Sequence, residues 1–273
     1  MALTINSNVA SLNAQRHLAE TTSLLNKSIE RLSSGLRINS ASDDAAGLAI
    51  ADKLRADSRI ASQAIRNAND GISALSIGEQ ALGKTGDVIT RLAELASEAA
   101  SGLISDSQRS GIQAEFSALV SEINRISNTT SFNGVNLLSG GTSVSLQVGL
   151  DGSANSRISF TTIDGSASGI GLSGISVSSS AAAQSALGAI TSAIALVATK
   201  RGTLGSIESR LNTAIDNLRV ASQNFLSAES RIRDADVAEE TANLTRNSIL
   251  QQAGVAVLAQ ANQQPGLALK LLG

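Results

Sequence analysis

The sequence predicts a mainly α-helical protein in which long helices pack as an antiparallel hairpin or coiled-coil bundle, with a small β-hairpin region in the middle of the chain. Two stretches repeat apolar residues every seven positions, which is typical of packed helices. Hydrophobic residues make up 42% of the chain but aromatic ones only 1%, so Leu, Ile, Val and Ala must fill the core. The single proline, Pro265, lies near the end, which leaves the rest free of helix breakers.

A first helix is predicted over residues 3–34, and Gly35 is suited to end it. Such an amphipathic helix is marginal alone in water and obtains its stability by packing. It either docks within its own domain or becomes ordered only on assembly. Its apolar stripe comprises Ile5, Val9, Leu12, Leu18, Leu25, Ile29 and Leu32.

A polar linker follows at residues 37–42, and a second long helix begins near Asp43 and Asp44. Adjacent carboxylates could suggest acid–base catalysis or a cation site. Their position before an apolar repeat favours helix capping, because the N-terminal end of a helix attracts negative charge. The seven-residue seam of this helix comprises Leu54, Ala61, Ala68, Leu75, Leu82, Ile89 and Ala96, and the helix breaks near residues 101–102.

A matching seam lies in the last third of the chain, over residues 187–232. The first apolar set comprises Ile190, Val197, Leu204, Leu211, Leu218, Phe225 and Ile232. A second set is half polar and comprises Leu187, Ile194, Arg201, Glu208, Ile215, Ser222 and Glu229. We expect the two long helices to pack antiparallel, with the polar members of the second set touching a third helix or neighbouring subunits.

Shorter elements are predicted between the two long helices. Residues 105–108 have the form of a capping box, which predicts a third helix to about residue 126. Asn133-Gly134 is a turn signal, residues 143–163 alternate as a β-hairpin around Asp151-Gly152, and residues 164–180 read as an irregular cap. After residues 230–236, a last helix runs to about residue 272.

One motif suggests nucleotide binding. Residues 78–85 (GEQALGKT) satisfy the phosphate-binding loop pattern, which needs a loop between a strand and a helix. Leu75, Leu82 and Ile89 continue the helical seam straight through it, so a chance match is favoured.

Composition argues against several other functions. The chain has no Cys and one histidine, His17, so a metal site or a catalytic triad is not expected. The net charge is −2 with both signs scattered, which is unlike a nucleic-acid-binding surface. No apolar run approaches about 18 residues, so no membrane insertion is expected. The start lacks the basic and apolar regions of a cleavable secretory signal. We therefore predict no enzyme, no cofactor and no metal.

Several long motifs resemble the bacterial flagellin family. They are residues 11–16 (SLNAQR), 30–50 (ERLSSGLRINSASDDAAGLAI), 131–138 (SFNGVNLL), 230–236 (SRIRDAD), 249–253 (ILQQA) and 258–262 (LAQAN). The resemblance covers about residues 1–140 and 200–273. Val257 replaces a common Met and Gly266 a common Gln. The short middle implies a member without large outer domains.

The resemblance implies an extracellular filament subunit for swimming motility, exported by the flagellar type III apparatus without a cleavable signal. Residues 1–42 and 234–273 would pair as an inner coiled-coil domain, and residues 43–233 would form a rod whose segment at about 131–180 faces outward. Implied partners are other copies, other flagellins, hook-junction and cap proteins, and an export chaperone at the C-terminal helix. The assembly residues would be Ile5, Val9, Leu12, Leu25, Ile29, Leu32, Leu244, Leu250, Val257 and Leu258.

The family also implies recognition by an innate immune receptor through a patch that here holds Arg91, Leu95 and Glu115. Ala93 replaces a basic residue in this region, and residues 97–98 (SE) replace a hydrophobic–polar pair. Both changes weaken a charged contact, so we predict poor receptor activation. The alternative functions are a hook–filament junction protein, which shares the helical termini, and a coiled-coil adaptor module, which would not need the mid-chain hairpin.

Overall fold

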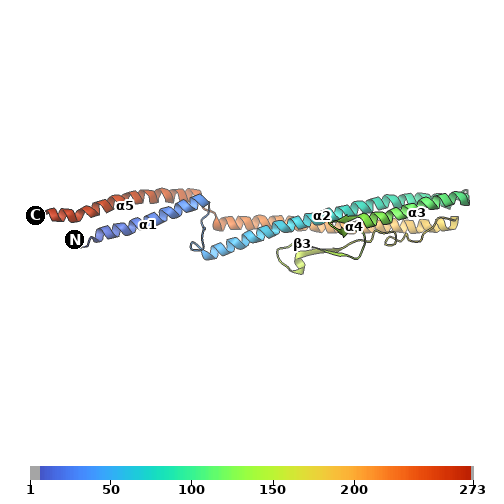
Figure 1. Ribbon diagram of the computed structural model, residues 1–273, viewed down its shortest axis with the longest axis horizontal. Helices are drawn as coiled ribbons and strands as arrows, with labels where there is room; N and C mark the ends of the chain where they lie inside the picture. Colours follow the sequence, from blue (N-terminus) through green and yellow to red (C-terminus); the bar gives the residue numbers. More distant parts are fainter. Residues whose placement is uncertain (1–6, 272–273) are drawn as a thin grey trace. The chain divides into compact units, whose positions relative to one another are not determined.

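The computed structural model describes residues 7–271 of the chain and has a mainly α-helical fold, as predicted (Figure 1). The helices are α1 (Val9–Ser34), α2 (Ala45–Ala100), α3 (Asp106–Thr129), α4 (Ser180–Arg233) and α5 (Val237–Leu271). The strands are β1 (Ser131–Phe132), β2 (Val135–Asn136), β3 (Ser143–Gln147) and β4 (Arg157–Thr161), with a 3-10 turn at Ala154–Ser156. The chain divides into two compact units, residues 57–223 and residues 1–56 with 224–273.

The unit of residues 57–223 is built on antiparallel packing of α2 against α4, as predicted. Three polar contacts mark the pairing: Ser58 with Ser222, Glu79 with Arg201, and the Ala100 carbonyl with the Ser180 hydroxyl. A step of 21 residues along α2 (58 to 79, then 79 to 100) is matched by 21 along α4 (222 to 201, then 201 to 180). Because 21 residues are three heptads, the two seven-residue seams stay in register over this length.

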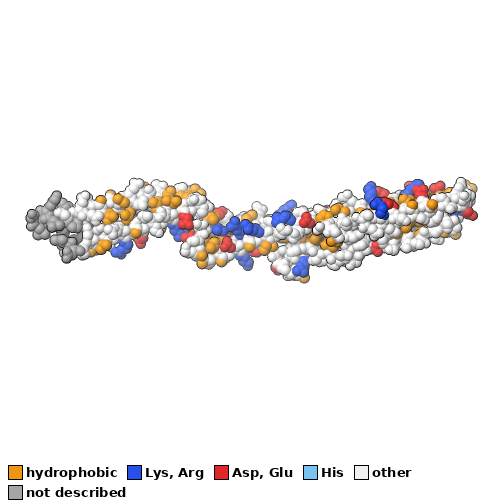
Figure 2. Space-filling view, viewed as in Figure 1, with side chains coloured by type: hydrophobic (Ala, Val, Ile, Leu, Met, Phe, Trp, Pro, Cys, Tyr) orange, Lys and Arg blue, Asp and Glu red, His pale blue; other side chains and the backbone are white. Residues whose placement is uncertain are grey.

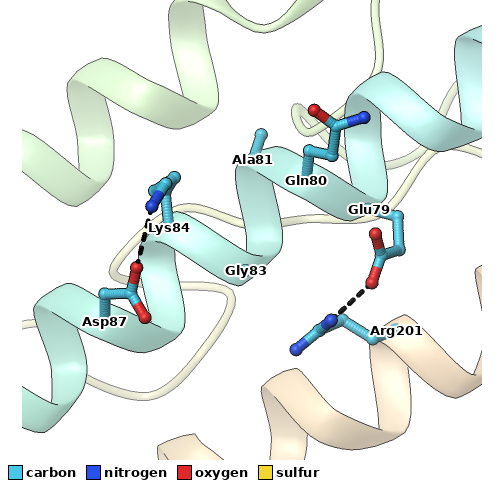
Figure 3. A pocket seen from close by; sticks show the side chains of 7 residues that line it. All are labelled: Glu79, Gln80, Ala81, Gly83, Lys84, Asp87 and Arg201. Atoms are coloured by element: carbon cyan, nitrogen blue, oxygen red, sulfur yellow. Dashed lines mark hydrogen bonds and ion pairs between the residues drawn. The ribbon is translucent and has the colours of Figure 1, made fainter.

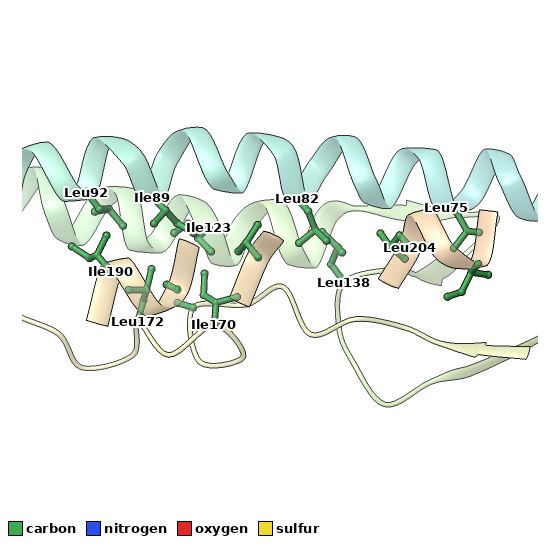
Figure 4. Close-up of a cluster of buried hydrophobic side chains, with 14 of the residues drawn as sticks. Leu75, Leu82, Ile89, Leu92, Ile123, Leu138, Ile170, Leu172, Ile190 and Leu204 are labelled. Atoms are coloured by element: carbon green, nitrogen blue, oxygen red, sulfur yellow. The ribbon is translucent and has the colours of Figure 1, made fainter. Parts of the chain in front are cut away.

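The core of this unit fills the space between α2, α3 and α4 (Figure 4). Large side chains that are fully buried there include Leu82, Ile89, Phe116, Ile123 and Leu211. Of the residues expected to pack the rod, eight are buried: Leu75, Leu82, Ile89, Ile190, Val197, Leu204, Leu211 and Leu218. Leu54, Phe225 and Ile232, which lie toward the other ends of the two helices, are half-buried.

The second seam of α4 differs from the expected one. Ile194 is 43% exposed, and the small residues Ala186 and Ala193 are buried in its place. Arg201 and Ser222 form hydrogen bonds with α2, which the sequence did not predict, and contact of the polar residues of this seam with neighbouring subunits stays a prediction. The pattern misled because large side chains dominate a hydrophobic repeat, whereas close packing of two helices favours small residues at the contact. Helix α4 also begins at Ser180, before its first large apolar residue.

Helix α3 begins with the predicted capping box. The Ser105 hydroxyl accepts from the Gln108 N–H, and the Gln108 side chain accepts from the Ser105 N–H at 3.0 Å. The adjoining end of α2 is held by Arg109, which is only 6% exposed. Its guanidinium donates to the carbonyls of Ala99 and Ser101, each at 2.8 Å, and pairs with Asp106 at 2.9 Å. A buried cation thus closes the turn between α2 and α3.

Two hairpins follow α3. Asn133 and Gly134 both have positive φ, +47° and +80°, and form the turn between β1 and β2 as predicted. Strands β3 and β4 pair antiparallel, with Val144 opposite Phe160 and Leu146 opposite Ile158. The apolar face expected for this hairpin packs toward α2 at Gly71, where an added Cβ would collide with the Leu146 side chain.

Residues 164–179, here named the strap, form no helix or strand apart from an isolated β-bridge at Asp164, but are firmly docked. The strap buries Ala167, Ile170, Leu172 and Val177. Helix α3 binds its backbone, since the Ala167 N–H donates to Asn124 Oδ1 at 2.9 Å and the Val177 N–H donates to Gln113 Oε1 at 2.6 Å. From α4, Lys200 donates to the Asp164 carbonyl at 2.8 Å. The strap is therefore part of the core rather than a loose cap.

The unit of residues 1–56 and 224–273 contains α1 and α5 side by side (Figure 1). Gly35 ends α1 with φ +72°, and its N–H donates to the Arg31 carbonyl at 2.8 Å. The two connectors pair with each other through an antiparallel bridge between Leu36 and Asp234. The predicted start of α1 at residues 3–6 lies outside the described residues.

The two adjacent carboxylates before α2 have different roles. Asp44 caps the helix, because its Oδ1 accepts from the Gly47 N–H at 2.8 Å. Asp43 does not cap it. Instead, Asp43 pairs with Lys27 of α1 at 2.6 Å and accepts from the N–H groups of Asn39 and Ser40. Asp43 therefore ties the linker to α1.

Candidate assembly surface

The α1–α5 unit carries many large apolar side chains that its own fold leaves uncovered. Figure 2 shows hydrophobic side chains along these two helices. Of the residues expected to mediate assembly, five are at least half exposed: Val9, Leu12, Ile29, Leu250 and Val257. Among the described residues of α1 and α5, four others with comparable exposure escaped the sequence prediction: Leu24, Val237, Ile249 and Val255. Such a density of exposed apolar residues is typical of a surface that binds other proteins.

The seam between α1 and α5 explains why these side chains stay outside. The residues buried along it are small or polar and include Ser11, Ala14, Ser28 and Ala261. Leu25, Leu32, Leu244 and Leu258, which the sequence also assigned to assembly, are half-buried. Ile5 lies outside the described residues. Because small residues take the internal positions, larger ones on the outer faces of both helices remain uncovered.

Polar contacts across the seam fix the antiparallel pairing of α1 and α5. The Ser11 hydroxyl donates to Asn262 Oδ1 at 2.7 Å, and Gln251 donates to the Thr22 hydroxyl at 3.2 Å. Nearer the connectors, Arg31 pairs with Glu240 at 3.6 Å, and Glu240 is 8% exposed. Polar contacts are thus spread along the seam from Ser11 to Arg31.

Charge is absent from a long part of α5. No Asp, Glu, Lys or Arg occurs between Arg246 and Lys270. Residues 249–261 (ILQQAGVAVLAQA) expose apolar side chains on more than one face, including Ile249, Val255 and Val257. A helix that is apolar nearly all round is normally buried on all sides. One partner helix, α1, covers only a part of it.

The phosphate-loop-like stretch lies inside α2 and lacks the loop that its chemistry requires. Residues 78–85 are helical, and the buried Thr85 hydroxyl donates to the Ala81 carbonyl. Around them, Lys84 pairs with Asp87 and Arg201 with Glu79, at the open surface drawn in Figure 3. Within residues 7–271, no group of three His, Asp or Glu side chains is placed to hold a metal ion.

The patch expected to resemble an immune-receptor site divides into exposed and buried parts. Arg91 bridges Glu94 at 2.8 Å and Glu115 at 2.9 Å, and all three side chains are about half exposed. The two carboxylates raise the pKa of Arg91. Leu95, by contrast, is 2% exposed and belongs to the core. Only the charged side chains of this patch are therefore accessible in the folded chain.

Helix α4 is the one described helix whose length and apolar composition would let it cross a membrane. A stretch of 18 residues within it has a mean hydropathy of 1.6. In the fold, its Ala183, Ile190 and Val197 are buried in the core formed with α2. Core helices often reach such hydropathy, so a single helix of this kind is weak evidence for a membrane span.

A packed helical unit and a helix pair with uncovered apolar faces define a class of protein: the subunit of a helical assembly. Two family models match the chain, the bacterial flagellin N-terminal helical region over residues 5–143 and the bacterial flagellin C-terminal helical region over residues 187–272. The chain belongs to the bacterial flagellin family. It is a structural subunit of the flagellar filament.

Individual relatives agree with this assignment. A flagellin of Halalkalibacterium halodurans is 42% identical over 269 residues, covering 98% of this chain and 99% of the relative. Flagellin FlaB2 of Treponema pallidum is 39% identical over 283 residues, with the same coverages. The crystal structure of Bacillus cereus flagellin is 25% identical, with a TM-score of 0.50, and covers 56% of this chain and 88% of that one.

Proposed function

We propose that the terminal helices drive filament formation, with residues 1–42 and 234–273 forming the inner domain of the filament. The observation that carries this proposal is the exposed apolar surface of α1 and α5, together with the charge-free stretch of α5. Full burial of a large aliphatic side chain contributes about 1.5–3 kcal/mol. Because these side chains are already about half buried, covering each one would contribute only a part of this, and several in each subunit would together favour assembly.

The contacts between neighbouring copies of the chain would join two different surfaces. A surface on one copy that meets a different surface on the next gives a heterologous interface, which propagates as an open helix when the rotation does not close. The rod of residues 43–233 would add lateral contacts through exposed residues such as Ile60, Ile77 and Leu196. The segment at about 131–180 would face outward.

Point substitutions at exposed positions test the proposal without disturbing the fold of the single chain. Val257→Asp places a charge on an apolar residue that is 58% exposed. Gln252→Asp adds the same charge at an exposed polar position of the same helix. After salting-out, electron microscopy should show long filaments for the wild type and for Gln252→Asp, and few or none for Val257→Asp.

Deletions give the broader test. Full-length protein should form long tubes, whereas chains lacking residues 1–40 or 236–273 should remain monomeric. Persistent monomers of the full-length protein under all conditions would contradict the proposal, and so would tubes formed by either deletion variant.

The remaining partners and properties extend this proposal. We infer that the subunit contacts other flagellins, hook-junction proteins and the filament cap, and that an export chaperone covers α5 before assembly. The exposed apolar residues of α5 support a chaperone, because they would otherwise aggregate. Family membership implies a location outside the cell. A catalytic role, nucleic-acid binding and membrane insertion form no part of the proposed function. A fluorescent ATP analogue that bound the monomer would contradict the interpretation of residues 78–85 as a chance match to the phosphate-binding loop pattern.

We expect weak activation of the innate immune receptor because of the charges around Arg91. Arg91 is already engaged by Glu94 and Glu115, and Glu98 adds a further negative charge near the end of α2. A new partner must compete with these ion pairs, and Ala93 offers it no cation. A reporter-cell response equal to that of an enteric flagellin would refute this expectation.

A further inference from the structure

Helix α5 runs through Pro265, the single proline of the chain. In an α-helix each backbone N–H donates to the carbonyl four residues earlier. Proline has no N–H, so the Ala261 carbonyl receives no such bond from residue 265. No other proline occurs in the chain, so no other carbonyl of α5 loses its donor in this way. Pro265 therefore leaves one particular carbonyl of α5 in need of a donor.

Asn8, at the start of α1, supplies that donor. Its Nδ2 donates to the Ala261 carbonyl at 2.8 Å. The other half of the same amide caps α1, since Asn8 Oδ1 accepts from the Ser11 N–H at 3.0 Å. Asparagine combines a capping acceptor with a donor at short reach, whereas aspartate offers only the acceptor. Both ends of the Asn8 amide are thus used, one within α1 and one across the seam.

The apolar part of the seam does not set its own register, which is left to polar contacts such as those of Asn8 with Ala261 and Ser11 with Asn262. The buried residues Ser11, Ala14 and Ala261 of the seam are small, and Gly254 lies against Leu18. Small side chains hold register weakly, because a slide of one helix along the other changes their packing little. A slide by one turn would instead place Asn8 at a carbonyl that already has a donor within its own helix. A single buried asparagine is known to set the register of helix pairs.

We propose that Asn8 and Pro265 act together as the register lock of the terminal helices. Pro265 creates the free acceptor, and Asn8 recognises it from α1. The two residues are coupled through the Ala261 carbonyl although neither needs to touch the other. The lock fixes how far α1 and α5 are offset along each other, and so it defines which exposed residues of the two helices lie side by side on the surface that neighbouring subunits meet in the proposed filament.

A double-mutant cycle tests the coupling. The variants are Asn8→Asp, Pro265→Ala and the double variant. Asn8→Asp keeps the capping oxygen and removes the donor, and Pro265→Ala restores an N–H for the Ala261 carbonyl. Asn13→Asp makes the same chemical change at an exposed position of α1, where the side chain only accepts from Arg16. Hydrogen exchange is measured for peptides covering residues 12–25 and 250–262, in the monomer and in filaments.

In the wild-type background, Asn8→Asp should speed exchange of both peptides about 3- to 10-fold, as expected for one lost hydrogen bond. In the Pro265→Ala background the same substitution should change exchange less than about twofold, because the acceptor is already satisfied. Asn13→Asp should have little effect in either. Equal acceleration by Asn8→Asp in both backgrounds, or none in either, would overturn the lock. Failure of the wild type to form filaments would contradict the proposed function instead. The double-mutant cycle measured on the monomer would still show whether Asn8 and Pro265 are coupled.

Discussion

Arg201 of α4 donates through Nε to Glu79 of α2 at 3.0 Å, midway between two other polar contacts of the same helix pair. The outer contacts lie three heptads away on each side, at Ser58–Ser222 and Ala100–Ser180. The seam of α2 and the first seam of α4 alone permit slides of one heptad at modest cost, since every position of these two seams is apolar. The polar contacts distinguish the observed register from these alternatives.

Although the Glu79–Arg201 pair helps to select the register, it should contribute little to the free energy of unfolding. Both side chains are at least one third exposed, and exposed ion pairs contribute about 0–1 kcal/mol. Arg201→Ala should lower the free energy of unfolding by no more than this, with Arg210→Ala on the same helix as control. Urea denaturation of the monomer measures both. A loss of several kcal/mol for Arg201→Ala alone would show that the pair has a larger structural role.

Removal of large side chains from the core should cost far more. Leu82 and Leu211 are fully buried between α2 and α4. Leu82→Ala or Leu211→Ala should lower the free energy of unfolding by about 2–5 kcal/mol, because each leaves a cavity. Leu103, which is 97% exposed, provides the matched control, and Leu103→Ala should cost almost nothing. Equal costs for Leu82→Ala and Leu103→Ala in urea denaturation would disprove the packing.

Much of this fold could be predicted from the sequence because helix periodicity and turn chemistry are local. The seams through Leu82 and Leu211, the end of α1 at Gly35 and the Asn133-Gly134 turn all depend on residues close together in the chain. The second seam of α4 could not be predicted in the same way. Ala193 is buried and Ile194 is exposed because of how closely α2 approaches α4, and the distance between two helices cannot be read from the local sequence of either one.

The polar contacts across the fold were equally invisible in the sequence. Arg109 reads as a solvated charge, yet it is buried against two backbone carbonyls. Asn8 reads as an ordinary helix cap, and its bond to Ala261 joins opposite ends of the chain. A proline interrupting a helix was the one signal that could have pointed to a free carbonyl near residue 261.

Arg109 should be essential for the turn between α2 and α3. Arg109→Ala removes the donors to two carbonyls at the end of α2 and should cost about 1–3 kcal/mol. Arg109→Lys should recover only part of this, because an ammonium lacks the planar fork of a guanidinium. Arg125→Ala, at an exposed arginine of the same helix, is the control. Thermal unfolding of the three variants should rank Arg109→Ala lowest, and no difference from Arg125→Ala would contradict the role.

The linker held by Asp43 should loosen in acid. The Lys27 side chain, with help from the Ser40 and Asn39 backbone N–H groups, holds the pKa of Asp43 well below its usual value near 3.8. A carboxyl with a lowered folded-state pKa stabilises the fold above the unfolded value, and this contribution fades as pH falls below it. The contribution of Asp43 is therefore full at pH 7 and declines below about pH 3.8.

Asp43→Asn provides the comparison for this pH dependence. At pH 7, amides of residues 36–42 should exchange faster in the variant than in the wild type, after correction for intrinsic rates. The difference should hold down to about pH 5 and shrink as pH falls through and below about 3.8. A difference that grows on acidification would have the wrong sign and would exclude the proposed pairing with Lys27.

Burial of α5 by neighbouring subunits is the central claim, and thiol labelling tests it most directly because the chain has no cysteine. Val257→Cys places a thiol at a residue that is 58% exposed in the single chain, and Asn155→Cys places one in the β3–β4 loop. On assembly, labelling at position 257 should slow by about tenfold or more, because thiol reactivity follows exposure, while position 155 keeps its rate. Equal labelling of position 257 in monomers and in filaments would contradict the account.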